Sequence, residues 1–176
     1  MPYLLLVLTT LFWSGNFVLS RGMHADIPPL ALSFWRWALA LLIMLVFSWR
    51  TCWRQSDIIV RERKYIIIQG LLGVTGFNSL IYLAVQTTTA VNAVLINSCT
   101  PILIALCALL INKEPLKPRQ WAGILLSLSG VTLIMVGGDL GSLIELDFNR
   151  GDLLVLCAGL VWALYSVNLK SFPQDL

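Results

Sequence analysis

Long apolar stretches recur along the whole chain and are separated by short polar connections. Each stretch is close to the ~20 residues that an α-helix needs to cross ~30 Å of hydrocarbon. The pattern therefore predicts an all-α integral membrane protein with six transmembrane helices. The expected spans cover about Tyr3 to Ser20, Leu30 to Trp49, Tyr65 to Val85, Val91 to Ile111, Trp121 to Val136, and Leu153 to Leu169.

Composition and charge agree with a lipid environment. Hydrophobic residues make up 58% of the chain and charged residues 12%, whereas soluble domains carry roughly 25% charged residues. The net charge of +3 comes from basic residues between the apolar stretches, where they signal topology rather than nucleic-acid binding. We therefore expect the lipid bilayer, and no nucleic acid, as a partner.

The basic residues favour one side of the membrane. Nine of the twelve Lys and Arg residues follow spans two, four and six, and basic connections face the cytoplasm. This arrangement predicts a cytoplasmic N-terminus. The nine residues are Arg50, Arg54, Arg61, Arg63, Lys64, Lys113, Lys117, Arg119 and Lys170, while Arg21 and Arg150 lie in outward connections and Arg36 lies within a span.

The stretch from Leu4 to Arg21 reappears 149 positions later, from Leu153 to Lys170. The second copy follows the first by five spans, an odd offset, so the predicted topology inverts the second one. Many secondary transporters are built from such inverted repeats, with the substrate site where the copies meet. We predict a five-helix repeat over residues 1–138, an outward connection over 139–150, and the first helix of a second repeat over 151–176, with Trp13 and Trp162 as partners.

Several spans carry polar side chains on one helical face. The stripes are Thr9, Trp13, Asn16 and Ser20 in span one, Thr75, Asn78 and Tyr82 in span three, and Asn97, Thr100 and Pro101 in span four, where proline also predicts a helix break. Span six offers Trp162 and Tyr165. Polar groups at membrane depth need partners. Either they line a shared cavity, or they join helices at about 0.6 to 2 kcal/mol each.

Arg36 is the one formal charge well inside an expected span. A central arginine costs about 2.5 to 3.5 kcal/mol on insertion scales. Its side chain either snorkels outward as an anchor beside Trp35 and Trp37, or faces a substrate as a cation. Both interpretations remain open on the sequence alone.

Other residue classes indicate little chemistry. No Asp or Glu falls within the spans as drawn, which argues against proton antiport through an embedded acid. Neither a nucleophile with a base, nor a phosphate loop, nor metal-ligand spacing is present, so we expect no enzyme activity, cofactor or metal. Glycines recurring at Gly70, Gly73 and Gly76, and at Gly123, Gly130 and Gly137, predict two ridges of helix contact.

The chain resembles the EamA-type permeases of the drug/metabolite transporter superfamily. The resemblance covers nearly the whole chain and rests on FWSGNF in span one, an arginine early in span two, and the run from Asn92 to Ile134 with Pro101 and Glu114. It implies ten helices in two inverted copies, an inner-membrane location, and amino-acid or related metabolite transport by alternating access. Glu114 would either gate the inner mouth or pair with nearby basic residues.

Doubling the repeat gives a carrier of about 298 residues, whereas this chain has 176. We therefore expect a permease truncated after the first helix of its second repeat, which could be inactive, homodimeric, or part of a longer product. The alternative is a non-transporting membrane remnant or helix-association partner. In the permease, the substrate path would use Trp13, Asn16, Arg36, Asn78, Tyr82, Asn97, Thr100, Pro101, Trp162 and Tyr165.

The predicted topology makes one direct expectation for labelling. A membrane-impermeant thiol reagent added outside should modify Ser142→Cys and spare Cys52, because the two positions fall on opposite sides. Labelling of Cys52 with protection of Ser142→Cys would reverse the orientation.

Overall fold

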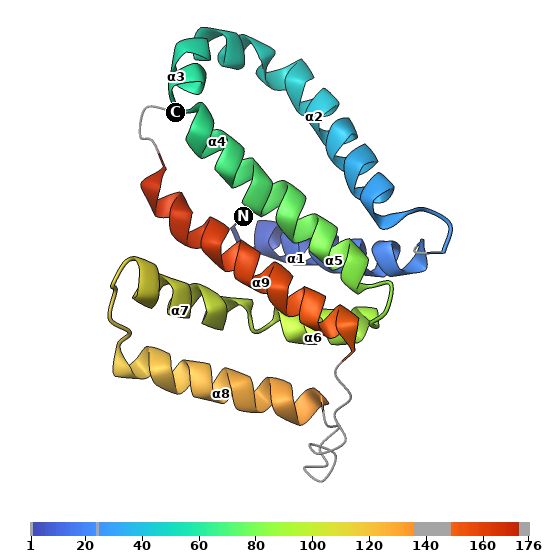
Figure 1. The fold of residues 1–176 in the computed structure, drawn as a ribbon, viewed down its shortest axis with the longest axis vertical. Helices are drawn as coiled ribbons and strands as arrows, with labels where there is room; N and C mark the ends of the chain where they lie inside the picture. Colours follow the sequence, from blue (N-terminus) through green and yellow to red (C-terminus); the bar gives the residue numbers. More distant parts are fainter. Residues whose placement is uncertain (1, 24, 136–148, 173–176) are drawn as a thin grey trace.

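The computed structural model describes residues 2–23, 25–135 and 149–172, and these residues form helices joined by short turns (Figure 1). Each expected span consists mainly of helix where it is described, so the prediction of an all-α membrane protein is confirmed. Ser142 and most of the predicted outward connection lie outside the described residues. The helices are α1 (Pro2–Gly22), α2 (Pro29–Arg54), α3 (Ser56–Arg61), α4 (Arg63–Gln69), η1 (Gly70–Gly76), α5 (Phe77–Ala84), α6 (Ala90–Asn97), α7 (Thr100–Ile111), α8 (Pro118–Met135), α9 (Arg150–Asn168) and η3 (Leu169–Ser171).

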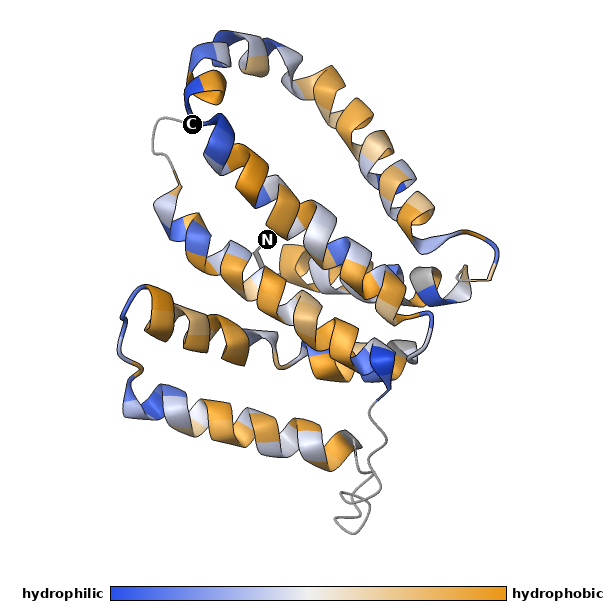
Figure 2. Cartoon of the chain, in the orientation of Figure 1, coloured by the Kyte–Doolittle hydropathy of each residue, from blue (hydrophilic) through white to orange (hydrophobic). Residues whose placement is uncertain are grey.

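Four helical segments in the described part of the chain are long and apolar enough to cross a membrane (Figure 2). They are Pro29–Arg54, Arg63–Ala84, Val91–Ile111 and Arg150–Ser171. Tyr3–Asn16 forms a shorter apolar helix, and α8, with 18 residues, does not belong to the set of four. The second to fourth and the sixth predicted spans thus have the length and composition that crossing the bilayer requires.

Two of the long segments are interrupted near their middle. In the third span a π-helix, η1, separates α4 from α5, and the Asn78 amide donates to the carbonyl oxygen of Val74 at 2.9 Å. In the fourth span α6 ends at Asn97 and α7 begins at Thr100. Pro101 has no N–H for the Asn97 carbonyl, so the predicted helix break is confirmed.

Helix α9 lies at the centre of the packing and contacts α5, α6, α7 and η1 (Figure 1). One apolar cluster joins it to α5 and α6 and consists of Ile81, Tyr82, Ala84, Val85, Ala93, Ile96, Val155 and Ala158. A second cluster joins it to α7 through Cys107, Ala163 and Val167. The C-terminal helix therefore holds the two broken segments together.

The start of α9 is fixed by a capping box. The backbone N–H of Asp152 donates to Asn149 Oδ1 at 3.0 Å, and the N–H of Asn149 donates to Asp152 Oδ2 at 3.1 Å. The hydroxyl of Thr88, which lies in the turn between α5 and α6, donates to Asp152 Oδ1 at 2.6 Å. Asp152 is 3% exposed. The expectation that no acid lies within the spans is therefore wrong at this helix end, where the Thr88 hydroxyl and the Asn149 N–H compensate the buried carboxylate.

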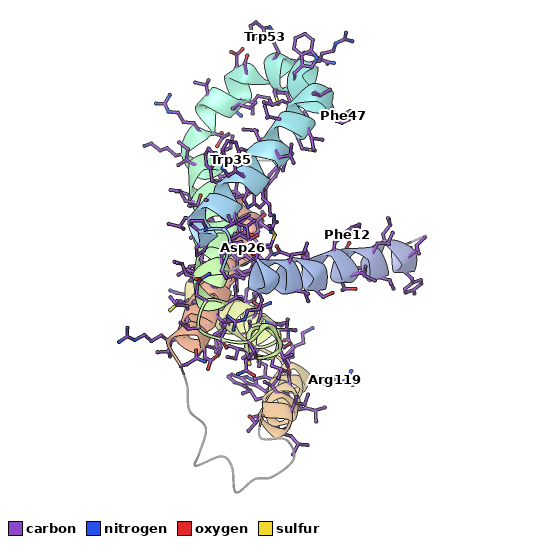
Figure 3. All side chains as sticks on the ribbon, turned by 90° about the vertical axis from the view of Figure 1, so that its right-hand side faces the viewer. Phe12, Asp26, Trp35, Phe47, Trp53 and Arg119 are labelled. Atoms are coloured by element: carbon purple, nitrogen blue, oxygen red, sulfur yellow. The ribbon has the colours of Figure 1, made fainter. Side chains whose placement is uncertain are left out.

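The helices α1, α2 and α8 lie at the periphery. Figure 3 shows α1 projecting away from the other helices, and its principal contacts are with α6. Apolar side chains along α1 and α2 remain exposed, including Phe12, Phe47 and Trp53 at 72%, 79% and 79%. In a membrane protein such surfaces face lipid or other apolar helices. Because α1 projects away from the other helices (Figure 3), the described spans do not form one parallel bundle.

The two predicted glycine ridges have different outcomes. A Cβ at Gly73 would lie 2.7 Å from the Tyr165 ring, and one at Gly76 would lie 3.0 Å from Val161, so both glycines support contact with α9. The prediction of a contact ridge in α8 is wrong for the described glycines, because a Cβ at Gly123 or Gly130 would meet nothing within 4 Å. Gly137 lies outside the described residues. In the first ridge, a Cβ at Gly70 would also meet nothing within 4 Å, so Gly70 supports no such contact.

Gly151 was not singled out by the sequence, yet a Cβ built there would approach neighbouring atoms more closely than one at any of the glycines above. A Cβ there would collide with the carbonyl oxygen of Ala84 and lie 2.6 Å from Thr87 Oγ1 and 2.8 Å from the backbone nitrogen of Thr88. Since two of these atoms belong to the backbone, the neighbours cannot move aside cheaply. Only glycine allows α9 to begin this close to the end of α5.

We expect Gly151→Ala to lower the free energy of unfolding by about 1 to 3 kcal/mol, because the added methyl overpacks the junction. Gly123→Ala is the matched control: its methyl meets open space, and alanine is favoured over glycine within a helix by roughly 0.5 to 1 kcal/mol. Thermal or denaturant unfolding in detergent compares the two. Equal stability of both variants would contradict the packing described at Gly151.

Candidate functional site

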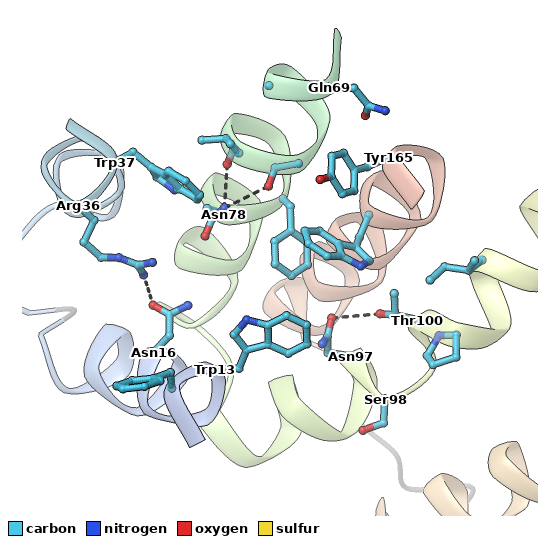
Figure 4. A pocket seen from close by; sticks show the side chains of 18 of the residues that line it. Trp13, Asn16, Arg36, Trp37, Gln69, Asn78, Asn97, Ser98, Thr100 and Tyr165 are labelled. Atoms are coloured by element: carbon cyan, nitrogen blue, oxygen red, sulfur yellow. Dashed lines mark hydrogen bonds between the residues drawn. The ribbon is translucent and has the colours of Figure 1, made fainter. Parts of the chain in front are cut away.

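A cavity of about 850 Å³ opens between α1, α2, the α4–η1–α5 segment, the α6–α7 segment and α9 (Figure 4). Of the ten residues predicted to form a substrate path, all of them described, nine line this cavity. Those nine are Trp13, Asn16, Arg36, Asn78, Asn97, Thr100, Pro101, Trp162 and Tyr165. The tenth, Tyr82, is 1% exposed and lies behind Asn16, to which it is bonded.

Arg36, Asn16 and Tyr82 form a connected group at one side of the cavity. The Arg36 Nη1 group donates to Asn16 Oδ1 (Figure 4), and the Tyr82 hydroxyl donates to the same oxygen at 3.0 Å. The Arg36 guanidinium carbon also lies 5.5 Å from the centre of the Tyr82 ring, within cation–π range. This geometry favours the cavity-facing position of Arg36 over the snorkelling one.

Four aromatic rings from three helices make up a second group, which we call the aromatic cluster: Trp13, Phe77, Trp162 and Tyr165. Trp162 is at its centre, with ring centroids 6.4 Å from Trp13, 4.8 Å from Phe77 and 5.0 Å from Tyr165. The Trp13 and Trp162 planes meet edge to face at 84°. The two tryptophans that the suspected repeat aligns are therefore in direct contact.

The remaining polar groups of the wall form their hydrogen bonds locally. Thr100 donates to Asn97 Oδ1 at 3.1 Å across the break between α6 and α7. Asn78 is 7% exposed, and its amide is bonded to the carbonyl oxygens of Val74 and Gly73 beside the π-helix. Asn78 thereby satisfies backbone carbonyls beside the π-helix, and the Asn97–Thr100 bond pairs two polar side chains at the α6–α7 break.

The sequence did not identify several residues of the wall. Gln69 is the most polar of them: its Nε2 donates to the Tyr65 hydroxyl at 2.8 Å, while its Oε1 is buried without a partner. Gln69, Gly73 and Phe77 recur at steps of four, so helical periodicity contained the signal. The others are Phe12, Trp37, Ile66, Gly70, Gly73, Val74, Phe77, Ser98 and Ile104.

Parts of the predicted stripes are wrong. Thr9 is exposed on α1 and donates to the Leu5 carbonyl of its own helix at 2.7 Å, and Thr75 is exposed on the other side of η1. Nothing is described for the Ser20 side chain. The stripes extend too far because a helical face wider than the cavity also includes residues beside it.

A smaller cavity of about 280 Å³ lies between α7 and α9 and shares Pro101 and Ile104 with the larger one. Glu114 and Lys170 lie on its wall, and the Lys170 Nζ bonds both carboxylate oxygens at 2.6 Å. The Lys170 hydrogen bond lowers the pKa of Glu114 from its usual 4.5. Glu114 therefore pairs with a cation from η3, directly after α9, instead of one of the nearby basic residues of its own loop.

Apolar helices that surround a cavity with a cation, amides and aromatic rings are typical of membrane transport proteins. Comparison with known families agrees: the model of the EamA-like transporter family matches residues 1–136. The chain belongs to this family, and it is a multi-pass membrane protein of a transporter class. The identification confirms the resemblance seen in its motifs.

The chain is also similar to curated proteins that are named as transporters without a stated substrate. The chain is 28% identical over 173 residues to the uncharacterized transporter YyaM of Bacillus subtilis (strain 168), covering 98% of this chain and 57% of the relative. It is 34% identical over 167 residues to an uncharacterized transporter of Archaeoglobus fulgidus, covering 94% and 56%. The chain thus spans about half the length of these relatives. No solved structure matches it significantly.

We expect Asn16→Ala to destabilise the fold by about 1 to 3 kcal/mol, because the buried Tyr82 hydroxyl loses its acceptor. Adding Tyr82→Phe removes the orphaned hydroxyl and should recover part of that loss. A double-mutant cycle by thermal unfolding measures the coupling. An identical effect of Tyr82→Phe in both backgrounds would show that the two side chains do not interact.

Proposed function

We propose that this chain carries small metabolites, amino acids or related compounds, across the membrane by alternating access, as one part of a ten-helix carrier. The observation that supports this function most strongly is the convergence of five helical segments on one cavity of about 850 Å³. Substrate sites of small molecules typically occupy about 300 to 1,000 Å³ and combine apolar walls with a few polar groups. The cavity has this size and composition.

The broken helices support the same proposal. Transporter sites form where helices are discontinuous at membrane depth, and both η1 and the α6–α7 break contribute to the cavity wall. A π-helix inside a span frequently marks a functional site. Gly73 and Thr100, one at each interruption, line the space that a substrate would occupy.

The contact between Trp13 and Trp162 fits a site at the meeting point of two repeats. One ring comes from α1, in the first proposed copy, and the other from α9, in the second. In this proposal the two helices are related by a pseudo-two-fold axis through the cavity. Rocking of the copies about that axis would open the cavity to each side in turn.

The alternative, a membrane protein that serves only helix association, also has an observation in its favour. Polar side chains join different helices, including Tyr82 of α5 to Asn16 of α1 at 3.0 Å and Tyr65 of α4 to the Asn168 carbonyl oxygen of α9 at 3.3 Å. Such bonds require no substrate. Flux measurements separate the two functions.

We expect proteoliposomes containing this chain to show uptake or efflux of at least one member of a panel of amino acids and related organic acids above empty vesicles. Trp13→Ala should lower that flux at least about tenfold, because it removes one ring of the aromatic cluster. Trp53→Ala is the matched control: Trp53 is equally large, 79% exposed and outside the cavity wall. Its flux should equal that of the unsubstituted chain.

Protease protection and monodisperse elution establish that each variant is folded and inserted. A folded, inserted chain without flux for any compound of the panel favours the helix-association alternative. Equal flux from both tryptophan variants would place the transport path elsewhere in the molecule.

A further inference from the structure

We propose that the cavity selects organic monoanions with a flat apolar body, and that it binds them more tightly than the corresponding zwitterionic amino acids. The inference rests on the proposed function and narrows its substrate class. It follows from the distribution of charge, of engaged acceptors and of aromatic surface around the cavity wall.

The described wall of the cavity carries one formally charged side chain, Arg36, and no Asp, Glu or Lys. A guanidinium offers five N–H donors in a planar fork that matches a carboxylate. The hydrogen bond that engages Arg36 with another side chain goes to a neutral amide oxygen, that of Asn16. Asn16 and the Tyr82 ring hold the guanidinium in place and stabilise it, but both are neutral, so its positive charge is not neutralised.

A substrate ammonium group would find poorer partners. Asn16 Oδ1 already accepts from Arg36 and Tyr82, and Asn97 Oδ1 accepts from Thr100. Gln69 belongs to the wall and its Oε1 has no hydrogen-bond partner, but that oxygen is buried. An ammonium that leaves water without a carboxylate partner loses more solvation than it regains, and the described wall offers no carboxylate. Aromatic faces attract cations, but the charge of Arg36 in the same cavity opposes a second positive group.

The aromatic cluster supplies the site for the body of the ligand. Trp162 contacts Trp13, Phe77 and Tyr165 with centroid separations of 4.8 to 6.4 Å. Rings arranged edge to face and tilted around a common centre favour a flat apolar group, since aromatic pairs stack offset or at right angles. One end of the cavity therefore suits a carboxylate and the other a ring.

Four compounds with one phenyl-ethyl skeleton test the proposal: 3-phenylpropionate, phenylalanine, phenethylamine and 3-phenylpropionamide. They present an anion, a zwitterion, a cation and a neutral amide. Binding to the full chain in lipid nanodiscs is measured by competition and by tryptophan fluorescence, neither of which requires transport. We expect 3-phenylpropionate to bind at least about tenfold more tightly than the other three, the difference typical of one charge-assisted hydrogen bond.

Two substitutions at one position isolate the charge. Arg36→Gln should remove the preference for 3-phenylpropionate over its amide, whereas Arg36→Lys should keep a preference while weakening it, because the planar fork is lost. Arg119→Gln is the control: Arg119 is exposed at the start of α8, outside the wall of either cavity. It should leave all four affinities unchanged within about twofold.

Phenylalanine or phenethylamine binding as tightly as 3-phenylpropionate would overturn the inference, and so would a preference for the anion that survives Arg36→Gln. Amino-acid flux in proteoliposomes together with equal binding of phenylalanine would reject the monoanion preference and leave the proposed carrier function standing. Absence of both binding and flux for every compound would reject the two proposals together.

Discussion

The docking of α9 against α5 and α7 is the interaction on which the rest of the structure depends. At its start, Gly151 allows the backbone to approach the end of α5, and the buried carboxylate of Asp152 accepts from Thr88 and from its own capping box. Further along, Val155, Ala158 and Ala163 are fully buried. Small side chains permit this approach, because packing must replace the missing hydrophobic drive between helices in lipid. Without α9, the cavity would lose the wall that carries Trp162 and Tyr165.

The second constraint is that polar groups at membrane depth need partners. The protein meets it at each helix interruption with a nearby side chain: Asn78 beside the π-helix and Thr100 with Asn97 at the α6–α7 break. Arg36 is the exception, because its charge meets only neutral partners within the described cavity. Asn78, Asn97 and Thr100 are thus bonded within the protein, whereas Arg36 keeps donor capacity on the cavity wall.

The peripheral helices distinguish this chain from a closed bundle. Apolar side chains of α1 and α2 remain exposed, and relatives in the family are nearly twice as long. In the proposed ten-helix carrier these surfaces would meet further helices as well as lipid. The direct contact of Trp13 with Trp162 ties α1 to the central helix in spite of its projecting orientation (Figure 3).

The sequence alone determined the helical class, the helix break before Pro101 and nine of the nineteen described residues that line the cavity, because hydrophobic periodicity and proline chemistry act locally. Only the tertiary structure decided which partner each polar group takes. Asp152 was expected in a connection and is buried in α9, Glu114 pairs with Lys170 from 56 positions away, and the α8 glycines face open space while Gly151 does not. Such choices depend on which helices meet and at what distance, and residue spacing within a single helix carries no information about its neighbours.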